Sequence, residues 1–264
     1  ESSGVPLDRL MPIVSVSGLG IEPELIALTK WVSERWWGSW RSVLSSASAP
    51  RMRERIVHSR RTPSRDIAAD AVSVAAFELF QAGGGLLVVP PALSSLAVAL
   101  RIACIGPVLV VCSSQKMASM GAAFLRRKRL STALVPDEWD NARGGVDVVI
   151  GTRSAVFAPC PDVTAIVVID EHDELLKEER SPAWDATAVA SERARLAGIP
   201  FICTSAVPSA QSLQVLSEHI VHVQTDSGWP RIIVVNLSDV PVAQSLLSSE
   251  LLEAVGTTGN TTVC

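Results

Sequence analysis

The sequence lacks the features that mark membrane-spanning and secreted proteins. Although 48% of its 264 residues are hydrophobic, no apolar run reaches the roughly 18 residues of a transmembrane helix. The longest apolar stretch, residues 85–100, contains prolines and serines and predicts a buried strand followed by a helix. The N-terminus also lacks the basic, apolar and small-residue order of a signal peptide. We therefore expect a cytoplasmic protein with a hydrophobic core and no membrane partner.

Metal-ligand and catalytic patterns are also missing. The five cysteines, at positions 104, 112, 160, 203 and 264, form no CxxC pair, which excludes a zinc ribbon and a thioredoxin motif. Most of them lie in apolar segments, which favours reduced cysteines in the core. His58, His219 and His222 have no metal-ligand spacing with the cysteines. No nucleophile elbow, catalytic triad or dinucleotide-binding glycine pattern is present, and we expect no metal or cofactor in this chain.

Charge is scarce and slightly negative overall, but the basic residues are clustered. The net charge of −4 gives no indication of a nucleic-acid partner by itself. However, six arginines and one glutamate lie between Arg51 and Arg65, and residues 126–129 form a second basic cluster. Such clusters either neutralise phosphates or form a solvated linker or helix face. In the first cluster we predict nucleic-acid contacts at Arg51, Arg53, Arg55, Arg60 and Arg61.

The N-terminal part contains one helical pattern. Residues 23–44 place apolar residues at Leu25, Leu28, Val32 and Trp36, which predicts a helix. Four tryptophans lie in this segment, at positions 31, 36, 37 and 40. They either form a core or interdomain contact, or stack on bases.

From about residue 66 onward, helical and strand-like patterns alternate. Helices are predicted over residues 68–82, from about 94, over 116–128 and over 185–197. Short apolar runs predict strands at residues 85–89, 108–112, 146–150, 165–169 and 200–204. Strands joined by helical crossovers favour a mostly parallel sheet with helices on both faces.

Two segments place functional side chains directly after strands. In residues 148–159, VVIGTRSAVFAP, a strand is followed by Thr152 and Arg153. Ligands of parallel α/β sheets bind beyond the carboxyl ends of the strands, where a hydroxyl and a guanidinium suit phosphate contacts. We predict such contacts for both residues, with a local ion pair of Arg153 as the alternative. In residues 165–179, AIVVIDEHDELLKEE, a strand runs into an acidic cluster.

These blocks, together with IPFICTSAVPSAQSL at residues 199–213, resemble motifs of superfamily 2 DNA helicases. They most resemble the primosomal protein N′ (PriA) family of replication-restart helicases, strongly over residues 146–213 and more loosely elsewhere. The resemblance implies an α/β fold with a RecA-like parallel sheet, preceded by a small helical piece and followed by the start of a second lobe. It also implies zinc in a part of the parent protein beyond residue 264.

The resemblance predicts four parts. These are the end of an N-terminal DNA-binding domain (1–57), a basic linker (58–66), a degenerate helicase lobe 1 (67–228) and a truncated second lobe (229–264). Because the sequence starts without methionine and stops within a pattern, we expect a fragment of a longer protein.

The family's nucleotide-binding loop is degenerate here. A P-loop holds phosphates and Mg²⁺ with a glycine-rich backbone, a lysine and a hydroxyl. By the resemblance, its glycines fall on Val89, Ala92 and Ser94, its lysine on Ser95 and its threonine on Leu96. Residues 90 and 91 are prolines, which remove N–H donors. We predict that this loop does not bind MgATP in the usual way.

The residues that hold the metal are altered as well. Counted without gaps, the family's metal-facing aspartate falls on Ile169, whereas a one-residue shift restores Asp170 and Glu171. These two carboxylates either hold a cation weakly or form a solvated strand end, and His172 is either a catalytic relic or a hydrogen-bonded turn residue. The family's arginines and histidine are missing from residues 182–187. We therefore predict relics in place of catalytic residues.

The resemblance and its losses together predict a DNA-binding replication-restart protein without helicase activity, and its status as an enzyme stays open. The expected partners are forked or single-stranded DNA and other primosome proteins. Two alternatives remain: an ATP-dependent helicase with unorthodox nucleotide contacts, and a structural module for protein interactions.

Overall fold

The computed structural model describes residues 20–49, 58, 61, 70–224, 251–253 and 256. The chain divides into two compact units, Glu1–Gly228 and Trp229–Cys264. In the second unit the described residues are helical, and the sheet and its helices belong to the first unit. The predicted contacts at Arg51, Arg53, Arg55 and Arg60 lie outside the described residues.

The first unit is built on a seven-stranded sheet in which all paired strands are parallel. The strand order is β3-β4-β2-β5-β6-β1-β7. The bounds are β1 Gly84–Val88, β2 Val108–Val111, β3 Thr132–Leu134, β4 Val148–Gly151, β5 Ala165–Val168, β6 Phe201–Ser205 and β7 Ile220–His222. The predicted α/β class with a parallel sheet is confirmed.

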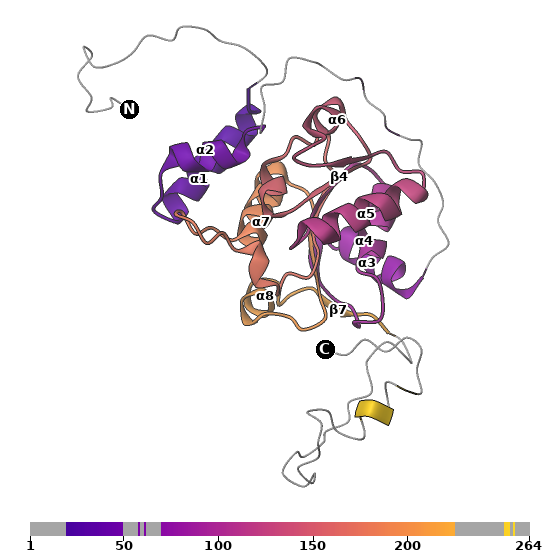
Figure 1. Ribbon diagram of the computed structural model, residues 1–264. Coiled ribbons are helices and arrows are strands. Elements are labelled where there is room, and N and C mark those ends of the chain that lie inside the picture. Colours follow the sequence, from indigo (N-terminus) through magenta and orange to yellow (C-terminus); the bar gives the residue numbers. More distant parts are fainter. Residues whose placement is uncertain are drawn as a thin grey trace, which may run out of the picture. The chain divides into compact units, whose positions relative to one another are not determined.

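Helices cover both faces of this sheet (Figure 1). One face carries α3 (Ala71–Gln81), α4 (Leu96–Ala103) and α5 (Gln115–Arg127). The other carries α1 (Pro23–Arg35), α2 (Trp40–Ala47) and α7 (Ala186–Ala197). Short elements complete the unit: α6 (Trp139–Gly144), α8 (Ala210–Val215) and the 3-10 turns η2 (Arg153–Phe157) and η3 (Glu174–Leu176).

The two faces enclose two separate cores. In β2, Leu109 and Val111 belong to the core beneath α7, while Val108 and Val110 belong to the core beneath α3, α4 and α5. Successive strand side chains point to opposite faces, so a strand covered on both sides needs an apolar residue at each position. All four residues of β2 are 0% exposed, which explains why this strand is a continuous apolar run.

The single N-terminal helix predicted from the spacing is wrong, because the chain forms two helices there. α1 and α2 are separated by a turn at Trp37 and Gly38. A Cβ added to Gly38 would lie 2.2 Å from the Cβ of Pro182, so the close approach requires glycine. The apolar spacing continues through this break, and packing against Pro182 rather than local pattern defines the turn.

The four N-terminal tryptophans have different environments. Trp31 and Trp36 pack edge-on, with ring centroids 5.6 Å apart. Trp40 donates from its indole Nε1 to Thr29 Oγ1 at 3.0 Å. Trp37 is 95% exposed. Packing inside the protein therefore accounts for three of these side chains but not for Trp37.

The described cysteines are core residues. Cys104, Cys112, Cys160 and Cys203 are free and buried, as the sequence predicts. Burial raises the pKa of the Cys112 thiol to about 12 and that of Cys160 to about 11. Since the thiolate is the nucleophile and the metal ligand, burial and the raised pKa disfavour the reactive form of Cys112 and Cys160.

Candidate functional site

The strand order brings three motif segments to one edge of the sheet. β6 lies between β1 and β5, and the three strands are parallel, so the segments after their carboxyl ends are neighbours. These segments are the degenerate loop (residues 89–95), the acidic cluster (residues 169–173) and residues 206–209 before α8. In open parallel sheets this edge is where ligands bind.

The backbone of the degenerate loop offers few N–H groups to a ligand. Pro90 and Pro91 have none. The N–H of Val89 donates to the carbonyl of Ser205 at 2.9 Å, and that of Leu93 donates to the carbonyl of Pro90 at 2.9 Å. A phosphate-binding loop instead turns successive N–H groups toward the anion. The loop is therefore poorly suited to hold phosphates.

Asp170 is the carboxylate that faces this loop. Its Oδ1 accepts a long hydrogen bond from Ser95 Oγ at 3.4 Å, whereas Ile169 is fully buried in the core. This geometry favours the alignment with the PriA motif that is shifted by one residue. In that alignment the family's metal-facing aspartate corresponds to Asp170 and not to Ile169. Ser95, which replaces the P-loop lysine by the resemblance, supplies a neutral hydroxyl where a phosphate site needs positive charge.

A cavity of about 370 Å³ lies between the degenerate loop and the acidic cluster. Its wall is mostly apolar, formed by Val89, Pro90, Pro91, Leu93, Leu96, Met117, Met120, Ile169 and Ala206. Its polar members are Ser94, Ser95, Asp170 and His172. Burial raises the pKa of Asp170, and nearby His172 and Ser95 offset this only in part. With one carboxylate and neither lysine nor arginine in its wall, the cavity disfavours a nucleoside triphosphate.

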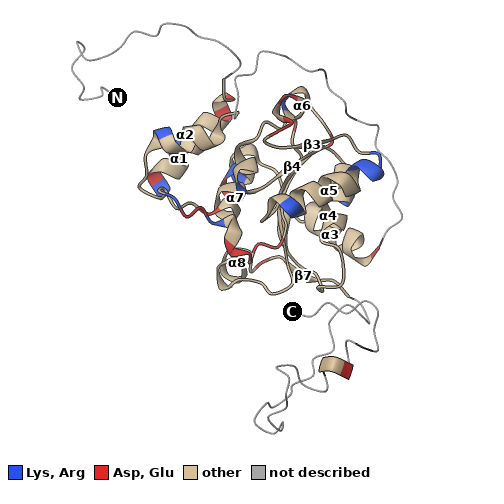
Figure 2. Ribbon diagram, in the orientation of Figure 1, with Lys and Arg blue, Asp and Glu red and all other residues tan. Residues whose placement is uncertain are grey.

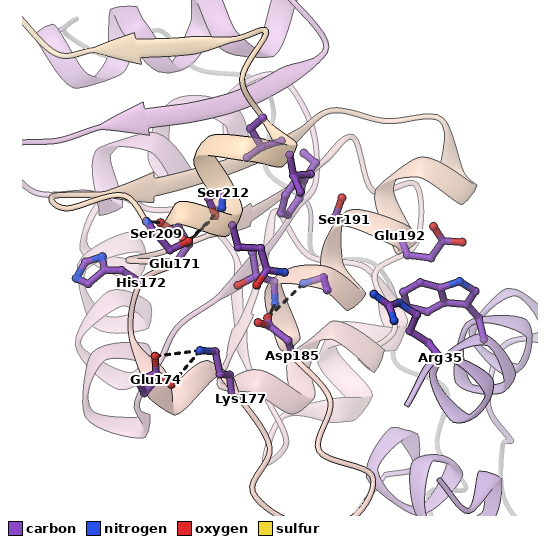
Figure 3. Close-up of a pocket in the computed structure, with 17 residues that line it drawn as sticks. Arg35, Glu171, His172, Glu174, Lys177, Asp185, Ser191, Glu192, Ser209 and Ser212 are labelled. Atoms are coloured by element: carbon purple, nitrogen blue, oxygen red, sulfur yellow. Dashed lines mark hydrogen bonds and ion pairs between the residues drawn. The ribbon is translucent and has the colours of Figure 1, made fainter. Parts of the chain in front are cut away.

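Glu171, the next residue, is enclosed by hydrogen-bond donors (Figure 3). It accepts from the N–H of Ser209 at 2.8 Å, from Ser209 Oγ at 2.7 Å and from Ser212 Oγ at 2.6 Å. Glu171 is 7% exposed. A general base needs to reach the water that it activates, but both carboxylate oxygens of Glu171 are occupied by α8 and its N-cap. Its role in this structure is to hold the acidic cluster against α8.

His172 and the backbone of Asp170 fix the acidic cluster to the end of β6. His172 Nδ1 lies 2.7 Å from Ser205 Oγ, and the N–H of Asp170 donates to Thr204 Oγ1 at 3.1 Å. This arrangement agrees with the interpretation of His172 as a hydrogen-bonded turn residue. No sequence pattern indicates the serine contacts, because they join segments more than thirty residues apart.

A second cavity, also of about 370 Å³, is lined by Glu171, His172 and residues of α1, α7 and α8. Figure 3 shows Arg35 and Glu192 at its α1 and α7 walls. Asp185 is already used as the cap of α7, accepting from two backbone N–H groups, and Glu174 pairs with Lys177 at 2.9 Å. Across the described ranges, no three potential metal ligands come together.

Thr152 and Arg153 follow β4 directly, as their pattern predicts. Arg153 Nε donates to Glu178 Oε2 at 3.1 Å. This is the local ion pair that was expected from the sequence as the alternative to a phosphate contact. Partial burial by itself raises the pKa of Glu178, but the backbone N–H of Arg180 and the Arg153 guanidinium lower it below its ordinary value. Thr152 is half-buried beside this pair. Contacts of Thr152 and Arg153 with DNA stay a prediction.

Arg61 is the one arginine of the first basic cluster among the described residues. It forms an ion pair with Asp162 at 2.9 Å and donates to the carbonyl of Pro161 at 2.6 Å. In the second basic cluster, Arg126 pairs with Glu138. Each of these arginines therefore already has an acidic partner.

Part of the chain is similar to bacterial replication proteins. Replication restart protein PriA of Thermotoga maritima is 40% identical over 80 residues, which cover 30% of this chain and 11% of that protein. PriA of Synechocystis sp. is 38% identical over 92 residues, 34% of this chain and 11% of the relative. PriA of Bacillus subtilis is 38% identical over 84 residues, 31% of this chain and 10% of the relative.

This segment is similar to PriA. The predicted resemblance to the PriA family is thereby confirmed over about a third of the chain. The matched segment spans about a tenth of the length of these curated relatives. No protein-family model matches the chain.

Likeness to solved structures is more distant. The helicase MrfA bound to DNA and AMPPNP has a TM-score of 0.42 and 14% identity, covering 64% of this chain and 31% of MrfA. The Saccharomyces cerevisiae Dbp5 C-terminal domain bound to Gle1 and IP6 has a TM-score of 0.36 and 15% identity, covering 55% of this chain and 91% of that domain. Within the described part, every helix is too short or too polar to span a bilayer.

Proposed function

We propose that this chain belongs to a replication restart protein that binds DNA at stalled or abandoned forks, helps to assemble the primosome and does not unwind DNA. The similarity to PriA supports the link with replication restart. Because the matched segment spans about a tenth of PriA, the activity and the partners of the longer protein are part of the proposal.

One observation carries the loss of the motor. The loop that would hold ATP has two prolines, and its Val89 and Leu93 N–H groups are used within the protein. The phosphates of a nucleotide would meet Asp170 rather than a lysine. A helicase needs ATP binding and hydrolysis to move along DNA, whereas a fork-binding scaffold needs only a surface that contacts phosphates.

The proposed DNA contacts are Thr152 and Arg153 after β4, with Arg61 as a further basic residue. Arg153 must exchange Glu178 for a phosphate to make this contact. Partly exposed ion pairs contribute at most about 1 kcal/mol, so this exchange is energetically accessible.

Titration of a fluorescent DNA fork, with and without ATP, tests this function. We expect binding at low salt that weakens as salt rises, no effect of ATP and no DNA-stimulated phosphate release. Arg153→Ala should weaken fork binding severalfold and reduce the salt slope by about 0.9. Arg195→Ala, which removes an exposed arginine from the last turn of α7, is the matched control and should not change the affinity.

Two results would overturn the proposal in different ways. Phosphate release stimulated by DNA would show a working motor. Absence of fork affinity at low salt would remove the DNA-binding part and favour an interaction module.

A further inference from the structure

Trp37 is a large aromatic side chain in an unfavourable position. It is 95% exposed, and its backbone φ is 50°, which bulky L-residues rarely adopt. Neither core packing nor backbone preference accounts for a tryptophan at this turn. Backbone strain that persists in a folded protein is a reason to look for function.

A polar cavity of about 580 Å³ lies next to this turn, between α2 and the segment before α7. Hydroxyl groups line it from both sides, on Ser39, Ser42, Ser45, Ser46 and Ser181. Arg41 and Arg180 supply two guanidinium groups, and both residues are exposed. Figure 2 marks the single basic position of α2. Pro182 and Trp184 complete the wall.

The charges in this cavity favour an anion. Its one acidic residue, Glu178, is already bonded by Arg153 and by the N–H of Arg180. In the part of the chain that the structure describes, Arg41 and Arg180 take part in none of the ion pairs. Hydroxyls and guanidinium groups are the donors that contact phosphates in nucleic-acid complexes.

The exposed tryptophan directly precedes the segment of the chain that lines the cavity. Gly38 follows Trp37 and touches Pro182, a residue of the cavity wall. Ser39, two residues after Trp37, also lines the cavity. The packed contact between Gly38 and Pro182 therefore holds the backbone of the Trp37 turn against the cavity wall.

We propose that this surface, formed by Trp37, Arg41 and Arg180, binds single-stranded DNA. A base stacks on the indole of Trp37, and the phosphates that follow it contact the two guanidinium groups and the serine hydroxyls. Stacking requires a base whose face is free, which a single strand offers and a duplex does not. The inference rests on the proposed DNA-binding function and extends it to a second site, which is joined to the first through the Arg153–Glu178 pair.

The test uses the same chain with four probes in a fluorescence anisotropy titration. These are oligothymidine of about 16 nucleotides, an abasic deoxyribose-phosphate strand of equal length, a blunt duplex and the fluorescent DNA fork. The variants are Trp37→Ala, Trp37→Tyr and the double variant Arg41→Ala/Arg180→Ala, with Arg195→Ala as the charge control. Circular dichroism and thermal melting verify that each variant folds.

Each residue has its own expected signature. Trp37→Ala should weaken oligothymidine binding about tenfold and leave binding of the abasic strand unchanged, while Trp37→Tyr keeps most of the affinity. The double arginine variant should weaken both strands and reduce the salt slope by about 0.7 for each phosphate that is no longer neutralised. Arg195→Ala should change neither.

The outcomes separate this site from the proposed function. Absence of fork binding in the unaltered chain overturns the proposed function itself. Normal fork binding, with oligothymidine affinity unchanged in Trp37→Ala and in the double variant, overturns only the site. Equal affinity for the abasic strand and oligothymidine overturns base stacking, and a blunt duplex that binds as tightly as oligothymidine overturns a single strand as the ligand.

Discussion

Asp170 and Glu171 are neighbours in the sequence, yet their carboxylates have opposite environments. Asp170 faces a mostly apolar cavity and accepts one long hydrogen bond, from Ser95. Glu171 accepts three short hydrogen bonds from Ser209 and Ser212. Asp170 therefore has no lysine or arginine beside it in the cavity, as a nucleotide site would require. Glu171 instead helps to hold the end of β5 against α8.

The difference shows that a side chain facing a cavity and a side chain holding the fold can be neighbours in the sequence. Pro90 and Pro91 remove two backbone N–H groups from the loop, which affects only ligands that need these donors. The Glu171 network joins the end of β5 to α8, so its loss would affect packing. Glu171 therefore contributes to packing whether or not the site has a catalytic role.

The largest expected effect comes from removing Glu171. Glu171→Ala leaves three donors without their acceptor, and we expect a loss of about 3 kcal/mol of unfolding free energy. That corresponds to a fall in Tm of roughly 6 to 12 °C for a chain of this size. Asp170→Ala should change the free energy by less than about 0.5 kcal/mol. Thermal melting of both variants measures the contrast, with exposed Glu179→Ala as control. Equal losses for Asp170→Ala and Glu171→Ala would show that the two carboxylates contribute equally to stability.

A smaller effect is expected for a single donor. Ser212→Ala removes the 2.6 Å hydrogen bond to Glu171 and should cost about 1.5 kcal/mol, since hydrogen bonds to charged groups contribute about 1.5–3 kcal/mol. Exposed Ser217→Ala is the matched control and should be neutral. Urea denaturation provides the measurement, and a neutral Ser212→Ala would show that the network does not support stability.

Glu178 represents an intermediate case, with a partly exposed ion pair to Arg153. Arg153→Ala should cost less than about 1 kcal/mol, because solvent screens such pairs. Its effect on fork binding can then be assigned to the missing guanidinium rather than to unfolding. A loss as large as that of Glu171→Ala, measured by the same melting experiment, would contradict this assignment.

The smallest effect concerns the pH dependence of stability at Asp170. Burial raises its pKa, so the folded chain keeps a proton at pH values where the unfolded chain has lost it. The protonated Asp170 contributes fully to stability at pH values below the ordinary aspartate pKa of about 3.9. This contribution is lost as the pH rises through the raised pKa of Asp170 in the folded chain. Asp170→Asn should therefore raise Tm at neutral pH, and the gain should shrink toward about pH 4. A gain that is equal at both pH values would contradict the raised pKa.

Much of the fold was predictable because its signals are local. β2 and β5 are short apolar runs that are buried at each position, and only a strand covered on both faces requires this. The edge strands β3 and β7 and the helix α6 were not predicted. These segments have only three to six residues, which is too few to show the periodic spacing of apolar residues that identifies a strand or a helix. The break between α1 and α2 was missed because the apolar spacing passes through it.

In the candidate site, only the features that depend on a single residue and its position in the chain could be predicted from the sequence. The positions of Thr152 and Arg153 after β4 and the absence of N–H donors at Pro90 and Pro91 follow from the chain itself. The partners of Glu171 lie 38 and 41 residues away. They depend on β6 and α8 being placed beside β5, which no local pattern contains.

The residue pattern alone was enough to predict the parallel α/β sheet and the loss of two N–H donors from the loop at Pro90 and Pro91, since apolar runs and proline chemistry belong to individual residues and their neighbours. Only the tertiary structure decided which carboxylate faces that loop. The same structure encloses Glu171 with serines and leaves Trp37 exposed at the turn that Gly38 packs against Pro182. These properties depend on which distant segments the strand order and the packing of Gly38 against Pro182 bring together.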